Sequence, residues 1–497
     1  MTAAFDPAAD PADRGLLSPV WASPDIAGAT GDAAIVAAML ELEAAWAESL
    51  EAAGLAEAGA GAAVRAVVRA AVSAAVGGTK ATADDGAAPE AVNAPSSVLA
   101  FDAGRLAMEA QGGGNPVIPL VKALREVTPE PGKRSVHKGL TSQDVLDSAL
   151  MLTARRVVVG LLADLAVAAD SLADLAAAHR TTPQVARTLA QHSLPSSFGL
   201  KAANWLQGVA HAEARVAALS FPVQCGGAAG TNASLVALGG EPAALAADWA
   251  RRAGLDAAVA PWQSFRGPVT DLGHALAAVC SAAGHVANDV MLLSRPEIGE
   301  LGEPIAEGRG VSSAMPQKQN PALSALIRSA ALKAPAQAMQ LELAAALSED
   351  ERTGGAWHTE WPALRELLRL AAGAAAAVRE IAGGLRVFPE RMRANLELSG
   401  PLLVSERIML ELSGVAEGGR AGIQKAVDAA LASGADPAEQ GRVLRKGLRA
   451  VVPSGAADDA RLDELLDPAG YQGDAAGIVD RILADYEARA ARRRRQT

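Results

Sequence analysis

Apolar side chains recur along this chain at the spacing of helices, and they do so over long stretches. Residues 33–55 place Val36, Leu40 and Trp46 on one side of a helix, so we expect that side to be buried. Residues 141–178 are apolar around much of a helical circumference, which favours a position inside a bundle. Further helices are expected over residues 196–218, 241–254, 268–295 and about 321–347, with a kink near Pro335 in the last.

Glycine- and proline-rich stretches interrupt these helices. Residues 77–97 are expected to form a loop, as are residues 300–319. Asn320 followed by Pro321 is typical of a helix start, with asparagine as the cap and proline in the first turn. Beyond Pro389 the expected helices are shorter and more charged. We therefore expect three helical domains, covering residues 1–140, 141–385 and 386–497, with the long helices in the middle one.

Composition supports an all-helical chain. Half of the 497 residues are apolar but only 3% are aromatic, and the apolar share is carried by alanine, leucine and valine. Alanine and leucine favour helix, whereas the aromatic and β-branched residues that strands prefer are sparse outside short stretches. The sequence therefore predicts an all-α fold, a long-helix bundle flanked by two smaller helical domains. Helices this long and apolar bury more surface than one chain covers, which indicates a homo-oligomer.

The charge and the cysteines argue against several classes of protein. A formal net charge of −11 argues against binding to nucleic acid, which needs a basic surface. Two cysteines, Cys225 and Cys280, are too few for a disulfide framework or a zinc site. The N-terminus lacks the basic start of a signal peptide, and apolar runs such as residues 161–178 are broken by aspartates, so no membrane span is expected. These features indicate a soluble cytoplasmic protein.

One loop carries the strongest chemical signal. Residues 310–321 read GVSSAMPQKQNP, which brings hydroxyl groups, a lysine and an asparagine to the start of an expected helix. The first turn of a helix has unpaired main-chain N–H groups and positive potential, and Lys318 adds a full charge. We therefore expect this loop to bind an anion.

The same loop closely resembles the signature loop of the fumarase/aspartase superfamily, with Val311 in place of a glycine. The resemblance implies that Ser312 is the catalytic acid/base and that the loop holds a substrate carboxylate. It also implies an all-α fold, no metal or organic cofactor, and a homotetramer whose active sites combine residues of three subunits. By the same resemblance, the substrate-binding residues of the loop are Ser313, Met315, Lys318 and Asn320.

Two further segments resemble characteristic regions of that superfamily. Residues 135–144 read SVHKGLTSQD, and within them Thr141 and Asp144 have the spacing of a capping box, so hydroxyl and N–H groups converge at a helix start. Residues 224–232 read QCGGAAGTN, and these small residues let the main chain approach a ligand closely. The two segments add His137, Lys138, Thr141, Ser142, Gln224 and Thr231 to the expected substrate-binding residues.

Within the superfamily, four features resemble the carboxymuconate cycloisomerase branch, and one of them is the glutamine of residues 141–144, which read TSQD. Residues 114–120 read GNPVIPL, residues 187–201 read RTLAQHSLPSSFGLK and are expected to be helical, and residues 357–362 read WHTEWP. From this resemblance, we expect His192 to support catalysis and Lys201 to bind an additional carboxylate of the substrate.

Two further segments depart from the patterns of the superfamily. Leu189 stands where fumarases and adenylosuccinate lyases have a histidine, and a leucine cannot donate a proton to a leaving group. A carboxylate leaving group needs little such help, which agrees with the cycloisomerase branch. Arg266 matches an expected substrate-binding arginine, but Gly267 and Pro268 replace the acid and the second arginine that follow it in that branch.

We therefore expect the interconversion of carboxymuconate and 4-carboxymuconolactone through an aci-carboxylate carbanion, with Ser312 as acid/base. The alternative is a lyase that releases fumarate from a substituted succinate of the adenylosuccinate, argininosuccinate or nitrosuccinate type. A non-catalytic structural protein that has kept the fold is a further alternative, against which the intact set Ser312, Lys318 and Asn320 argues. In both catalytic cases the partner is a small polycarboxylate, with neither nucleic acid nor a membrane involved.

Overall fold

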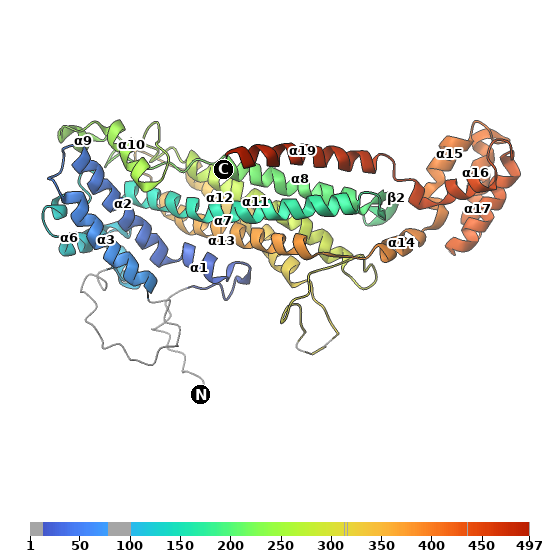
Figure 1. Ribbon diagram of the computed structural model, residues 1–497, viewed down its shortest axis with the longest axis horizontal. Coiled ribbons are helices and arrows are strands. Elements are labelled where there is room, and N and C mark those ends of the chain that lie inside the picture. Colours follow the sequence, from blue (N-terminus) through green and yellow to red (C-terminus); the bar gives the residue numbers. More distant parts are fainter. Residues whose placement is uncertain (1–12, 78–100, 313, 316, 435, 497) are drawn as a thin grey trace. The chain divides into compact units, whose positions relative to one another are not determined.

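The computed structural model describes residues 13–77, 101–312, 314–315, 317–434 and 436–496 (Figure 1). The described chain is all-α apart from two short pairs of strands, which confirms the predicted fold class. It divides into two compact units. The first unit comprises Met1–Ala163, Ala214–Ser281 and Ser329–Ala375, and the second comprises Asp164–Glu213, Ala282–Arg328 and Ala376–Thr497.

Helix α2 (Asp32–Ala52) is the centre of the N-terminal part of the first unit. It packs against α3 (Ala60–Gly77) and α10 (Pro242–Ala253), where the rings of Trp46 and Trp249 meet edge to face with centroids 5.2 Å apart. Trp46 is fully buried, as its place on the apolar side of the helix predicts. Shorter elements complete this part: η1 (Pro19–Trp21), α1 (Pro24–Thr30), α5 (Ala103–Ala110), α6 (Val117–Val127), η2 (Gly132–Arg134) and α9 (Ala233–Ala237).

Five long helices each contribute residues to both units, and within each unit they pack against one another. In the first unit, Gly273 lies so close to Leu341 that a Cβ atom on the glycine would come within 2.5 Å of the leucine side chain. In the second unit, Arg379 pairs with Asp164 at 2.6 Å. The five helices are α7 (Ser142–Ala178), α8 (Phe198–Ala217), α11 (Gly267–Leu293), α12 (Ala322–Ala346), which continues through Pro335, and α13 (Ala356–Gly384).

Residues 187–201, which we expected to be helical, largely form a β-hairpin. Strands β1 (Pro183–Thr188) and β2 (Gln191–Ser197) pair antiparallel in the second unit, and α8 begins only after them. Leu189 and Ala190 form the turn, with φ values of 51° and 63°. Glycine or asparagine usually occupies such left-handed positions, so this sequence lacks the ordinary signal of a hairpin. The prediction of a helix here was wrong.

Short helices beyond residue 388, which the shift after Pro389 predicts, form an apolar core in the second unit. Ile408, Ile423, Leu444 and Leu462 are fully buried in it. The division into three domains stays a prediction. The remaining elements of this unit are β3 (Leu301–Gly302), β4 (Arg386–Val387), α14 (Pro389–Glu397), η3 (Gly400–Val404), α15 (Ser405–Leu412), α16 (Gly419–Ala432), α17 (Pro437–Val451), α18 (Asp459–Leu466), η4 (Pro468–Gly470) and α19 (Ala475–Gln496).

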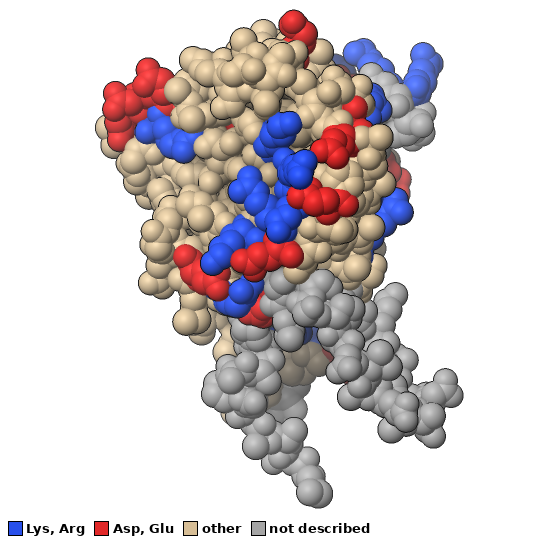
Figure 2. Space-filling model, turned by 90° about the vertical axis from the view of Figure 1, so that its left-hand side faces the viewer, with Lys and Arg blue, Asp and Glu red and all other residues tan. Residues whose placement is uncertain are grey.

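Helix α11 is long and apolar enough to cross a membrane by length and composition alone. Half of its most apolar stretch is buried inside the structure, as in the core helix of a soluble protein. Figure 2 views the side on which α2, α3 and α10 lie in Figure 1, and shows basic side chains mixed with acidic ones. Ion pairs of the first unit, such as Arg65 with Glu48 at 2.8 Å, are typical of such a surface.

Candidate functional site

The carboxylate of Asp144 joins two of the segments that we expected to bind substrate. Its Oδ2 atom accepts hydrogen bonds from the main-chain N–H groups of Thr141 and Gly227, at 2.9 and 3.0 Å, and its Oδ1 atom accepts one from Gly226 at 2.9 Å. Asp144 is fully buried. Burial raises its pKa to about 6 although the three N–H groups act in the opposite direction. The start of α7 and the glycine-rich turn are therefore held together by one buried charge.

Thr141 stands directly before α7, as the capping-box spacing predicts. The Thr141 main chain supplies one N–H group to Asp144, and its carbonyl accepts the N–H of that residue at 3.0 Å. Ser142 is the first residue of the helix and is half-buried, so its side chain can reach a ligand at this end. The unpaired N–H groups of a 37-residue helix meet here, which favours a carboxylate.

Arg352 is a basic residue of this region that we did not select from the sequence. Its Nη2 atom donates to the hydroxyl of Thr141 at 2.5 Å and to the carbonyl of Ala228 at 3.4 Å. It therefore contacts both of the segments that Asp144 joins. It lies in the loop between α12 and α13, 211 residues from Thr141, and nothing in its local sequence indicates this contact.

His137 lies beside the same helix start and is held by a buried acid. Its ring Nδ1 atom is 2.6 Å from Oε1 of Glu43, and its main-chain N–H donates to Oε2 of the same carboxylate at 2.8 Å. Lys138 has a different position from the one expected. Its ammonium group donates to the carbonyl of Leu55 at 2.7 Å, and its own carbonyl accepts the indole N–H of Trp46 at 2.9 Å. Lys138 therefore anchors this segment to α2 instead of facing a ligand.

A cavity of about 440 Å³ opens beside His137 and Ser142 in the first unit. Val117 and Val121 of α6 give it an apolar side, and three basic residues with one acid lie around it. The basic residues are Lys122, Arg125 and Lys133, and the acid is Glu126. This composition suits a small anion with an apolar backbone.

Gln224 and Thr231 lie at opposite ends of the glycine-rich segment. Gln224 is fully buried and its Oε1 atom accepts the N–H of Trp262 at 2.7 Å, so its side chain shapes the core of this segment. Thr231 is exposed. Of the two expected binding residues, Thr231 is the one whose side chain a ligand can reach.

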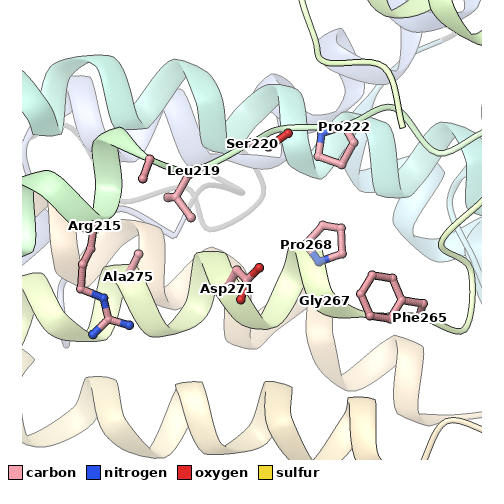
Figure 3. A pocket seen from close by; sticks show the side chains of 10 residues that line it. Arg215, Leu219, Ser220, Pro222, Phe265, Gly267, Pro268, Asp271 and Ala275 are labelled. Carbon is pink, nitrogen blue, oxygen red and sulfur yellow. The ribbon is translucent and has the colours of Figure 1, made fainter. Parts of the chain in front are cut away.

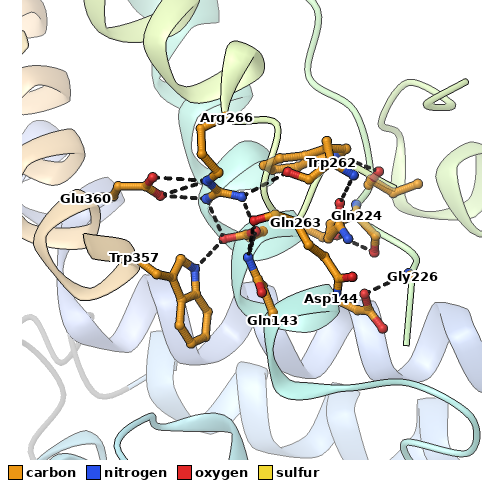
Figure 4. A network of polar contacts seen from close by, with 12 residues as sticks. Gln143, Asp144, Gln224, Gly226, Trp262, Gln263, Arg266, Trp357 and Glu360 are labelled. Carbon is orange, nitrogen blue, oxygen red and sulfur yellow. Dashed lines mark hydrogen bonds and ion pairs between the residues drawn. The ribbon is translucent and has the colours of Figure 1, made fainter. Parts of the chain in front are cut away.

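Arg266 was expected to contact substrate, but it is buried in an ion-pair network (Figure 4). Its Nη1 and Nη2 atoms donate to Asp147 at 2.7 and 3.1 Å, and its Nε and Nη2 atoms donate to Glu360 at 3.0 and 2.5 Å. The carbonyl of Trp262 accepts a further bond, and the indole of Trp357 donates to Asp147 at 2.8 Å. Every guanidinium nitrogen is thus engaged within the protein. Arg266 is therefore a structural residue here.

The two departures after Arg266 line a second cavity of the first unit, of about 460 Å³ (Figure 3). Gly267 and Pro268 form the start of α11 there, and Phe265 beside them is 71% exposed. Arg215 and Asp271 add one charge of each sign to the lining. Since these charges balance, the cavity has no clear preference for a polyanion.

The signature loop lies in the second unit, and two of its main-chain N–H groups point at the Ser312 hydroxyl. The Ser312 Oγ atom accepts main-chain N–H bonds from Ala314 at 3.3 Å and from Met315 at 3.2 Å. N–H groups that point at this oxygen stabilise the alkoxide that a base must form. The Lys318 side chain is exposed and Asn320 is half-buried, while Ser313 lies outside the described residues.

The start of α12 is already occupied by an acid of the protein. The buried carboxylate of Glu303 accepts the N–H groups of Leu323 at 3.1 Å and Ser324 at 2.6 Å. We expected this helix start to attract a substrate anion, but Glu303 takes that place. The positive charge of the loop therefore comes from Lys318 and not from the helix end.

His192 and Lys201 are engaged elsewhere in the second unit. His192 lies on β2, and its ring Nδ1 atom is 2.8 Å from the hydroxyl of Ser399. Burial and the nearby charge of Arg187 lower the pKa of His192, so the ring is neutral at pH 7. Lys201 contacts Asp289 at 3.4 Å. The contacts of both side chains within the described part of the chain are with residues outside the signature loop, so their assignment to the site stays a prediction.

Among the residues that the structure describes, no group of three or more histidine, cysteine, aspartate or glutamate side chains could hold a metal ion. The structure brings His137, Thr141, Ser142 and Arg352 together in the first unit, and Ser312 and Lys318 share a loop of the second.

Known proteins with similar sequences have related activities. A nitrosuccinate lyase of Streptomyces davaonensis is 42% identical over 484 residues, which cover 95% of this chain and 94% of that protein. A 3-carboxy-cis,cis-muconate cycloisomerase of Bradyrhizobium diazoefficiens is 37% identical, covering 82% of this chain and 91% of that protein. Both similarities extend over most of each chain.

Solved structures and a family model agree with these relatives. The crystal structure of the 3-carboxy-cis,cis-muconate lactonizing enzyme from Pseudomonas putida matches with a TM-score of 0.81 and 31% identity, covering 95% of this chain and 99% of that one. The model of the lyase family matches residues 22–335. The chain therefore belongs to the lyase family of the fumarase/aspartase superfamily and is an enzyme.

Proposed function

We propose that this enzyme is a β-elimination lyase that releases fumarate and nitrite from 2-nitrosuccinate. The similarity to the nitrosuccinate lyase carries this proposal, because at 42% identity it covers 95% of the chain. The similarity to the cycloisomerase covers 82% at 37% identity. We therefore base the proposed substrate on the nitrosuccinate lyase, the relative that shares more of this chain.

Nitrite as the leaving group agrees with the absence of a general acid at position 189. Leu189, at the position where relatives in the superfamily carry a histidine, cannot donate a proton, and its side chain is 99% exposed at the tip of the hairpin. Nitrite is the anion of a moderately strong acid and departs without protonation. An amine leaving group, as in adenylosuccinate, would need the acid that this position lacks.

The reaction begins at the carbon that does not bear the nitro group. Ser312, as an alkoxide, removes a proton from that carbon, and the electron pair of the C–H bond moves into the adjacent carboxylate as an aci form. The pair then returns to form the carbon–carbon double bond, and the C–N bond breaks with its electrons leaving on nitrite. The two N–H groups at Ser312 Oγ support this role, because they favour the charged base.

The charges of the intermediate need fixed donors. One carboxylate would bind at the start of α7, to Thr141, Ser142 and His137. The other would bind to Lys318 and Asn320 of a loop from another protomer, since the active sites are proposed to combine protomers. Arg352 would bind the nitro group, since its guanidinium is fixed beside the Thr141 hydroxyl at 2.5 Å.

We further propose a cytoplasmic homotetramer with active sites shared between protomers. Three apolar side chains of α12 support an oligomer, since Leu332, Met339 and Leu343 are 79%, 59% and 47% exposed. Their spacing places them on one side of the helix, where a second copy would cover them. The two free cysteines fit a reducing compartment.

Carboxymuconate cycloisomerisation is the second candidate, supported by the cycloisomerase relative and by residues 357–362. Two of these residues, Trp357 and Glu360, belong to the buried network around Arg266. The match at these two residues is therefore evidence for a shared fold more than for a shared substrate.

A substrate panel with the purified full-length protein separates the candidates. We expect nitrite and fumarate to form in equal amounts from 2-nitrosuccinate, measured by a diazo assay and by chromatography. Loss of carboxymuconate without nitrite formation would favour the second candidate. If both compounds remain unchanged with a folded protein, the proposal is rejected together with its alternative.

A further inference from the structure

Both oxygens of a single buried carboxylate serve His137. Glu43 lies on α2 with no exposed surface, and it receives the His137 main-chain N–H at 2.8 Å and the ring Nδ1 atom at 2.6 Å. A carboxylate buried in a helical core is unfavourable unless it is paired. Since the described contacts of Glu43 are with this one residue, its place in the core depends on His137.

The main chain of His137 is held in a conformation that histidine rarely adopts. Its φ is 57°, in the left-handed region, which costs a non-glycine residue about 1–3 kcal/mol. The bond from its N–H group to Glu43 is made in this conformation of the segment. The same carboxylate thus fixes both the backbone and the direction of the ring.

The ring is aimed at the cavity beside α6. Because Nδ1 is bound by Glu43, Nε2 lies on the opposite edge of the ring, and His137 lines the cavity together with Ser142. The cavity also holds Lys122, Arg125 and Lys133, so an anion entering it meets positive charge.

We propose that Glu43 is a positioning residue that keeps His137 as an imidazolium, whose Nε2–H donates a charged hydrogen bond to a substrate carboxylate in this cavity. The inference rests on the proposed function in one respect, namely that the substrate is a polycarboxylate. It adds to that function the residue that sets the charge and orientation of His137.

The charged groups around the ring support this assignment. Burial by itself would lower the pKa of His137, but the charge and hydrogen bond of Glu43 outweigh it, with Asp144 of α7 acting in the same direction and Arg125 of α6 opposing. The net pKa is raised. The imidazolium form is therefore favoured while Glu43 is ionised.

The first test measures the ring of His137 in the protein without substrate. NMR of the seven histidines, with His137 assigned by its loss in His137→Gln, should show a ring protonated on both nitrogens at pH 7. In Glu43→Gln, the side-chain carbonyl of the glutamine can still accept the main-chain N–H of His137. Its amide N–H group then donates to Nδ1 of the ring. The ring should then be neutral at pH 7 with the proton on Nε2. A neutral ring in the wild type, or one unchanged in the variant, would overturn the proposal.

The second test measures binding with fumarate as the probe. We expect fumarate to shift the Nε2 signal of His137 in the wild type, and Glu43→Gln to weaken fumarate binding roughly tenfold, as a charged bond becomes a neutral one. With 2-nitrosuccinate, KM should rise by a similar factor while kcat changes little. If the Gln variant does not fold, Glu43→Asp replaces it in the test. This variant keeps the charge, so His137 should remain an imidazolium.

Glu48→Gln is the matched control on the same helix, because Glu48 pairs with Arg65 at 2.8 Å and does not contact His137. It should leave the ring and fumarate binding unchanged, and equal effects of both variants would point to a general loss of structure and reject the proposal. The NMR result is independent of activity. Absence of nitrite formation with an intact imidazolium would therefore reject the proposed function and leave the Glu43 pair standing.

Discussion

The Oδ1 atom of Asp144 accepts the main-chain N–H of Gly226 at 2.9 Å, across 82 residues of sequence. This bond places a buried negative charge directly beneath two segments that are proposed to hold a substrate carboxylate. Three main-chain N–H groups stabilise this charge, and His137 acts on it in the same direction. The two oxygens of one side chain thus set the spacing of the two segments.

The stability of the enzyme should depend on pH through Asp144. Its folded pKa, raised by burial to about 6, exceeds the ordinary value of 3.8, so the folded protein holds a proton that the unfolded chain releases between these values. The free energy of unfolding therefore falls as pH rises from about 4 to about 6 and is level above it. Urea unfolding at several pH values should show this slope in the wild type and a reduced slope in Asp144→Asn.

Asp248→Asn is the control for this slope. The pKa of Asp248 is lowered to about 2, although burial opposes the effect of Arg252 and the other partners, so its contribution to stability is lost only below pH 4. The slope between pH 4 and 6 should therefore persist in this variant. An unaltered slope in Asp144→Asn would show that other groups cause it.

Replacing Ser312 by alanine should remove catalysis and leave the fold intact. We expect nitrite release to fall by roughly 10³-fold, in the range of a lost general base. The two N–H groups that bind Ser312 lie in exposed surroundings, so water can replace the hydroxyl and the melting temperature should not change. Ser281→Ala, which removes an exposed hydroxyl bound within its own helix, should remain fully active. Turnover near the wild-type rate in Ser312→Ala would exclude Ser312 as the base.

Replacing Arg352 by methionine should weaken substrate binding. The loss of its charge beside Thr141 should raise KM roughly 10- to 100-fold, as expected for one charge-assisted hydrogen bond. Since Arg352 is exposed, urea unfolding should be nearly unchanged. Arg156→Met removes another exposed arginine of the first unit, paired with Glu41 at 2.5 Å, and should leave KM unchanged. Equal KM values in both variants would remove Arg352 from the site.

Replacing Arg266 by methionine should destabilise the protein by about 3–5 kcal/mol, because Asp147 and Glu360 would be left as unpaired buried acids. Combining it with Asp147→Asn and Glu360→Gln should recover part of this loss, as measured by urea unfolding. If the single variant is stable but has an increased KM, Arg266 contacts the substrate after all. Burial and the neighbouring charge of Asp147 already raise the pKa of Glu360 against the effect of Arg266, so the loss of Arg266 should raise the pKa of Glu360 further.

The sequence predicts four of the five long helices, because their apolar spacing is repeated over many turns, whereas α13 was not among the expected helices. The helix expected over residues 141–178 is found as Ser142–Ala178, since apolar positions recur along its whole length. The hairpin at residues 183–197 was missed because its turn contains neither glycine nor asparagine, the residues that usually indicate a turn. Leu189 and Ala190 adopt the left-handed angles there instead.

The partners of charged residues could not be predicted from the sequence. Lys138 and Arg266 were assigned to substrate by their place in motifs, but Leu55 and Asp147, far away in sequence, engage them. Arg352 was missed for the same reason, since only the folded chain brings it to Thr141. Motifs identify which segments meet at the site, whereas the long-range contacts decide which side chains remain accessible.

The signature loop is closed at its base. The N–H of Asn320 donates to the carbonyl of Gly310 at 2.9 Å, and Gly310 has a φ of 68° with its α-carbon so close to Asn320 that a side chain would collide with it. Glu303 separately satisfies the first turn of α12. The described ends of the loop are therefore held by contacts that involve neither the Ser312 nor the Lys318 side chain. Either side chain can thus be replaced without disturbing the start of α12, so that a loss of activity in such variants reports on chemistry and not on folding.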